Sequence, residues 1–95
     1  MQTLWQDLRY VALGVTQAMF GEKEGTLALL RRSLELNPNG LASAASLNRT
    51  AMHLVVIGKV DEAIAVLKAG EELHPQASVF TTSLKRISDK KAQKY

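Results

Sequence analysis

Apolar residues recur three or four positions apart along most of the chain, the spacing that gathers them on one face of an α-helix. Gly and Pro interrupt this pattern at Gly21, Pro38, Gly58 and Pro75. Because Pro cannot continue a helix and Gly favours a turn, these positions divide the chain into separate helical segments. The pattern predicts an all-α fold of five helices, over about residues 4–19, 23–36, 41–57, 60–73 and 79–90.

The fifth segment differs from the others because its apolar residues form a single narrow stripe. Phe80, Leu84 and Ile87 make that stripe, and polar residues occupy most of the remaining positions. A helix at the end of a helical stack needs this pattern, with one face on the core and the rest in water. We therefore expect a capping helix, with Ser78 as its N-cap and Thr3 in the same role for the first helix.

The chain also repeats itself with an offset of 37 residues. Residues 21–38 align without gaps to residues 58–75, and six of the eighteen aligned pairs are identical: Gly21/Gly58, Ala28/Ala65, Leu30/Leu67, Glu35/Glu72, Leu36/Leu73 and Pro38/Pro75. A fixed period of this length is typical of proteins built from stacked helical hairpins. Such proteins bind partners on a surface, so the repeat favours binding over catalysis.

Two units, about residues 7–40 and 44–77, resemble tetratricopeptide repeats, each an antiparallel pair of helices. In this pattern small residues stand where two helices cross closely, and large residues fill the gaps. The first unit supplies Tyr10, Leu13, Gly14, Thr26, Leu30, Ser33 and Pro38 at the signature positions. The second supplies Leu47, Thr50, Ala51, Leu54, Ala63, Leu67, Gly70 and Pro75. Gln17 and Thr50 depart from the large apolar residues that are usual at their positions.

The resemblance implies a single domain over residues 1–95, a short α-α superhelix of two repeats closed by residues 78–95 as capping helix and basic tail. An unrelated helical bundle with Gly and Pro at its turns is the alternative fold. In the tetratricopeptide family the first helix of each pair lines a concave groove. By position, that groove would be lined by Leu8, Val11, Val15, Met19, Asn48, Arg49, Met52, Val55 and Val56, with Ala12, Ala18 and Ala45 between them.

An apolar groove suits a hydrophobic peptide or an amphipathic helix. The resemblance thus implies a protein–protein interaction module, such as an adaptor, a co-chaperone or an assembly factor. Two repeats fall short of the roughly three that a stable stack needs, and a small domain has a marginal core. We therefore expect a homodimer that covers Val11, Val15, Met52 and Val56, or packing on the rest of a longer protein.

Few residues suggest a metal-binding or catalytic site. His53 and His74 are the only histidines, and the chain has no Cys, so we expect no metal site. We also expect no catalytic residue and no cofactor, because the acidic pairs 61–62 and 71–72 lie on predicted helix surfaces rather than in a cleft. His74 stands in a turn and is expected to be solvated. Trp5 is expected to cover the open end of the core.

The net charge of +3 is concentrated at one end of the chain. Residues 85–95 hold five Lys and Arg against one Asp, whereas residues 1–84 hold seven against eight acidic residues. Basic residues at a helix C-terminus oppose its dipole favourably, so we prefer this role to nucleic-acid or membrane-surface binding. The absence of Cys, of a signal peptide and of a long apolar run predicts a cytoplasmic protein without a membrane span.

One alternative function belongs to a different class. Residues 41–54 resemble the helix-turn-helix of transcriptional regulators, in which Asn48, Arg49 and His53 would face the major groove of DNA. Ser46 stands where a turn Gly is usual, and this interpretation leaves the internal repeat unexplained. A small DNA-binding protein is therefore the second hypothesis.

Overall fold

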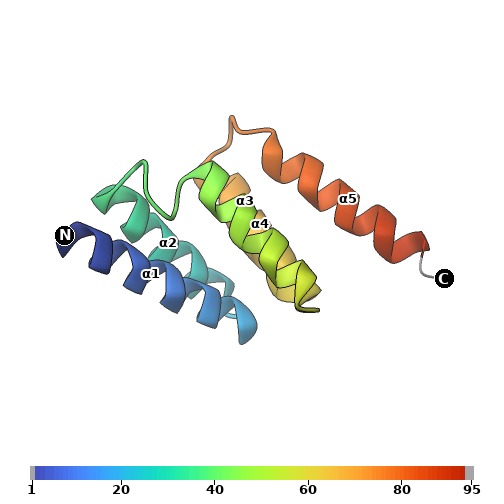
Figure 1. Cartoon of the computed structure of the whole chain (residues 1–95), viewed down its shortest axis with the longest axis horizontal. Helices are drawn as coiled ribbons and strands as arrows, with labels where there is room; N and C mark the ends of the chain where they lie inside the picture. The colour runs from blue at the N-terminus through green and yellow to red at the C-terminus, as the bar shows by residue number, and fades with distance from the viewer. Residues whose placement is uncertain (1, 94–95) are drawn as a thin grey trace.

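The computed structural model describes residues 2–93, with the side chains of residue 6 and of residues 8–89 (Figure 1). Within this range the chain is all-α, and no strand is present. The helices are α1 (Gln2–Met19), α2 (Lys23–Leu36), α3 (Ala44–Val56), α4 (Val60–Leu73) and α5 (Val79–Gln93). The side chain of Trp5 and the basic side chains beyond residue 89 are not among those described, so the predictions for them stay predictions.

The predicted bounds of α2 and α4 are confirmed to the residue, whereas two helix starts differ from the prediction. Helix α1 begins at Gln2, so Thr3 lies inside the helix rather than at its N-cap. Helix α3 begins at Ala44 instead of residue 41, because Ser43 is the N-cap and its side chain accepts a hydrogen bond from the amide of Ser46 at 3.4 Å. The preceding loop packs inward, and Ala42 is fully buried.

Both hairpins close with the same backbone turn, at positions that are 37 residues apart. Gly21 has a φ of 74° and Gly58 a φ of 86°, the left-handed region that glycine adopts without strain. In the second hairpin the Lys59 amide donates to the Leu54 carbonyl and the Gly58 amide to the Val55 carbonyl. The first hairpin has the same pair of bonds, Glu22 to Gln17 and Gly21 to Ala18. This is the Schellman arrangement that ends a helix at glycine.

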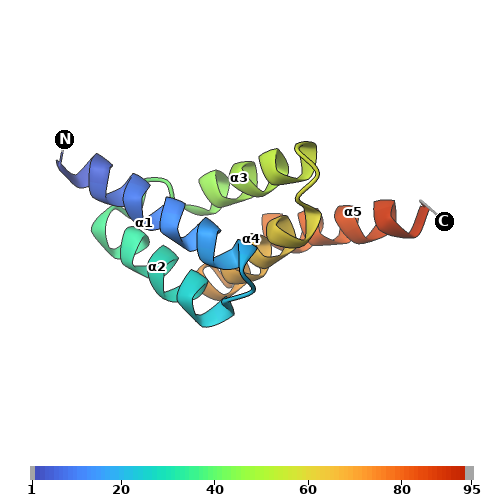
Figure 2. The same ribbon diagram turned by 90° about the horizontal axis from the view of Figure 1, so that it is seen from below.

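Helix α4 occupies the centre of the molecule. It contacts α1, α2, α3 and α5, whereas α1 and α3 do not contact each other within the described residues. Figures 1 and 2 show α3 stacked on α4, with the first hairpin on one side and α5 on the other. Helix α5 contacts both helices of the second hairpin, but that hairpin meets the first through α4. The two joints along the stack therefore differ.

The joint between α4 and α5 is tightly packed around Phe80, which is fully buried against Gly70. The ring of His74 stacks on Phe80 with centroids 6.1 Å apart. Nε2 of His74 lies 2.8 Å from the carbonyl oxygen of Ala42. Since a carbonyl only accepts, Nε2–H is the donor. His74 is half-buried, so the prediction that it is solvated is wrong. Its side chain joins the segment after α4 to the loop before α3.

Candidate functional site

The predicted groove positions divide into an outer and an inner row on each helix. The outer rows, named here the α1 stripe and the α3 stripe, are Leu8, Ala12, Val15 and Met19 on α1, and Ala45, Arg49, Met52 and Val56 on α3. The spacing of three or four residues keeps each stripe on one helix face. The two stripes are equivalent under the 37-residue repeat, so the same helix face is exposed in both hairpins.

Exposure is also equivalent between the two stripes. The first, second and fourth members of each are exposed, with Leu8 at 48% and Val56 at 83%. The third members, Val15 and Met52, are half-buried and pack against the core. Both views place α1 and α3 on the same side of the molecule, in front of α2 and α4 in Figure 1 and above them in Figure 2. The stripes therefore belong to two helices that lie on the same side of the molecule.

The inner rows do not form a binding surface. Val11 and Ala18 are each 7% exposed and belong to the core, so their assignment to the groove is wrong. Their repeat equivalents, Asn48 and Val55, are half-buried. The Oδ1 atom of Asn48 accepts a hydrogen bond from the hydroxyl of Ser83 on α5, and Val55 packs against the core. These side chains lie further around each helix, on the side that faces the other helices.

Sequence reasoning missed two exposed apolar residues, each of which directly follows the last member of a stripe along the chain. Phe20 is 77% exposed and its repeat equivalent Ile57 is 65% exposed, and each directly precedes the glycine of a hairpin turn. The sequence signal for these two residues is their position, because each repeat has an apolar residue immediately before its turn glycine. A shallow hollow lies on the same side of α1, beside Leu8 and Ala12. It is also bordered by Gln6 and Arg9.

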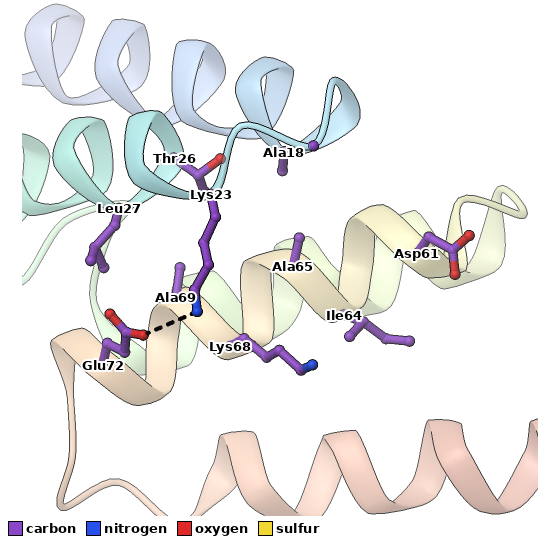
Figure 3. Close-up of a pocket in the computed structure, with 11 residues that line it drawn as sticks. Ala18, Lys23, Thr26, Leu27, Asp61, Ile64, Ala65, Lys68, Ala69 and Glu72 are labelled. Atoms are coloured by element: carbon purple, nitrogen blue, oxygen red, sulfur yellow. Dashed lines mark ion pairs between the residues drawn. The ribbon is translucent and has the colours of Figure 1, made fainter.

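A separate pocket lies at the joint of the two hairpins, and we call it the seam pocket (Figure 3). It has a volume of about 250 Å³. It is lined by Ala18 and Gly21, by Lys23, Thr26 and Leu27 of α2, and by Asp61, Ile64, Ala65, Lys68, Ala69 and Glu72 of α4. Nζ of Lys23 lies 3.7 Å from Oε1 of Glu72 at its edge. Sequence reasoning did not find this pocket, because it depends on which helices meet.

Other kinds of site have little support among the described residues. They contain no group of three His, Cys, Asp or Glu residues arranged to hold a metal ion. Every buried side-chain nitrogen or oxygen in this part of the chain has a hydrogen-bond partner. None of the helices described is long and apolar enough to cross a membrane.

The helix-turn-helix hypothesis is corrected by the structure. It requires a turn near Ser46 within residues 41–54, but α3 is one continuous helix over Ala44–Val56. Asn48, which would face DNA, instead binds Ser83 of α5.

Comparisons with models of known protein families, with curated proteins and with solved structures gave no match. The resemblance to tetratricopeptide repeats therefore rests on the residues quoted above and on the paired hairpin turns.

Proposed function

We propose that this chain is a non-enzymatic protein-interaction module of two tetratricopeptide-like repeats. Its partner is a peptide or helix that lies on the α1 and α3 stripes. The observation that supports this proposal is the exposure of large apolar side chains at two pairs of equivalent positions, Met19 with Val56 and Phe20 with Ile57. Leu8 of the first hairpin is exposed as well. A surface side chain that is apolar in both copies of a repeat is suited to binding rather than to folding.

The energetics favour an apolar partner. Burying one exposed Val, Leu or Met side chain contributes about 1.5–3 kcal/mol relative to leaving it in water. Several such side chains on two helices can offset the cost of ordering a short peptide. An amphipathic helix presents apolar residues at a spacing of three or four, which matches the spacing within each stripe. Arg49 is the charged member of the stripes, so an acidic group on the partner would complement it.

A second copy of the chain is the occupant expected when no partner is present. Two repeats and a capping helix leave the stripes in water, and self-association through them would cover Val15, Met52 and Val56. Val11 is excluded from this interface because it is already in the core. Sedimentation equilibrium should find a dimer that Val56→Glu dissociates. A stable monomer at high micromolar concentration would reject self-association while leaving peptide binding open to test.

Peptide selection from a random display library tests the proposed function. Selected peptides should bind the native chain, and the Leu8→Glu, Val56→Glu double variant should lose that binding by at least about tenfold, since two apolar contacts become charged. Ala28→Glu is the matched control, because Ala28 is exposed on α2 away from the stripes. Far-ultraviolet circular dichroism should show unchanged helicity in all variants. Equal binding by the double variant and the control would refute the proposal.

A further inference from the structure

The seam pocket lies on α2 and α4, outside the two stripes, and requires its own explanation. We propose that it binds a linear aliphatic carboxylate with a chain of about six carbon atoms. This length follows from the pocket volume divided by the volume that one water molecule occupies in the liquid. This site is independent of the proposed interaction surface, so either can fail without the other.

The walls of the seam pocket are apolar where the two hairpins approach. Figure 3 shows Ala65 and Ala69 on the edge of α4 that faces α2, and Leu27 on α2 above them. Because alanine side chains are only methyl groups, a volume of about 250 Å³ remains between the helices. A narrow aliphatic slot of this kind favours a chain of CH2 groups, since binding removes their apolar surface from water.

The mouth of the pocket offers an exposed basic side chain to an acidic ligand. Four charged side chains border it, two basic and two acidic. Lys23 is paired with Glu72, and Asp61 is engaged by another group of the protein. Lys68 is exposed and has no ion pair within the described part of the chain. Lys68 is therefore the basic side chain at the mouth with which a ligand carboxylate would pair.

The positions of the two lysines fit a ligand that enters tail first. The Lys23 side chain runs past Ala69 to Glu72 and closes one side of the slot (Figure 3). Lys68 lies on α4 further from α2, at the outer rim. Its flexible stem lets the ammonium group follow a carboxylate held at the mouth. The apolar tail would then lie along Ala65 and Ala69.

Two residues of the first hairpin offer matched controls, because they are an alanine and a basic residue that do not line the seam pocket. Ala28 and Arg31 of α2 are the repeat equivalents of Ala65 and Lys68. Both are exposed, whereas Ala65 and Lys68 border the seam pocket. A change at either position therefore reproduces the chemistry of a pocket variant without touching the pocket.

The test is a titration of the intact chain with hexanoate, followed by the amide chemical shifts of residues 18–27 and 61–72. We expect saturable shifts with a Kd of about 1 mM, typical of a ligand this small. Ala65→Leu should abolish binding by filling the slot. Lys68→Gln should weaken it about fivefold, the scale of one exposed ion pair. Ala28→Leu and Arg31→Gln should bind as the native chain does.

Comparison ligands separate the apolar tail from the charge. Hexanol should bind about fivefold more weakly than hexanoate, and hexylammonium should bind more weakly still. Binding of hexanol as tight as that of hexanoate, or an unchanged Kd in Lys68→Gln, would overturn the proposal. So would shifts that do not saturate by about 10 mM, a concentration well above the expected Kd. If Ala65→Leu fails to fold, Lys68→Gln and Arg31→Gln still decide the result, because both changes are at exposed positions.

Discussion

Gly70 of α4 and Phe80 of α5 are packed so closely that no side chain fits between them. A Cβ atom built on Gly70 would come closer than 3.0 Å to three carbons of the Phe80 ring. The ring is fully buried and cannot swing into solvent. In the first hairpin the equivalent residue is Ser33, which belongs to a different joint. The glycine therefore marks the position where the capping helix docks.

Gly70→Ala should destabilise the chain by about 1–3 kcal/mol, the usual effect of overpacking a core, although alanine favours a helix more than glycine does. Urea denaturation measures the difference. Gly25→Ala is the matched control in α2, where a Cβ would meet the flexible end of Gln17 at 3.3 Å. That variant should be neutral or more stable by up to about 1 kcal/mol. Equal stability of the two variants would contradict the packing described for α5.

His74 should contribute to stability through its hydrogen bond as well as its ring. His74→Phe retains the stack on Phe80 but leaves the Ala42 carbonyl without its donor, and should cost about 1–3 kcal/mol. His74→Gln keeps a donor at a similar reach and should cost less. Thermal denaturation of the two variants compares them. A His74→Phe variant as stable as the native chain would show that the bond to Ala42 contributes nothing.

Asn48 should act as a structural residue rather than as a partner contact. Its hydrogen bond with Ser83 joins α3 to α5, so Asn48→Ala and Ser83→Ala should each destabilise the chain by about 1 kcal/mol. In the double variant the two effects should not add, which a double-mutant cycle detects. Peptide affinity should be unchanged in Asn48→Ala once the folded fraction is taken into account. A loss of affinity without a loss of stability would return Asn48 to the binding surface.

The two hairpin turns should respond alike to substitution. Gly58→Ala places a side chain at a φ of 86° and should cost about 1–2 kcal/mol, and Gly21→Ala at 74° should behave similarly. Gly58→Asn should cost less, because asparagine tolerates the left-handed region. Chemical denaturation of the three variants tests this. A Gly58→Ala variant of native stability would contradict the turn geometry, since no neighbouring atom lies within 4 Å to explain a rescue.

Local signals explain which parts of the fold the sequence could predict. Helices α2 and α4 each follow a turn glycine and end before a residue–proline pair, so their bounds are correct to the residue. The start of α3 was placed early because Leu41 continues the apolar spacing. In the structure Leu41 and Ala42 belong instead to a loop that packs on the core. Periodicity alone cannot separate a buried loop residue from the first turn of a helix.

The spacing of apolar residues could not predict how the hairpins pack against each other. An apolar stripe shows that a helix face is buried, but not which helix covers it. Val11 and Ala18 are buried in the core, and the seam pocket lies beside Ala65 and Ala69 where α2 meets α4. Leu8 is exposed, because exposure follows from the face of a single helix, and its place in a groove stays a prediction. The interaction with a partner stays a prediction.

The most direct test of the interaction surface is a nuclear magnetic resonance experiment on the methyl-labelled chain with a selected peptide bound. The proposed function predicts intermolecular nuclear Overhauser effects from the peptide to the methyl groups of Leu8, Met19, Met52 and Val56. The buried methyl groups of Leu67 and Ile87 should show none. Contacts confined to α2 or α5, with none to α1 or α3, would contradict the central claim.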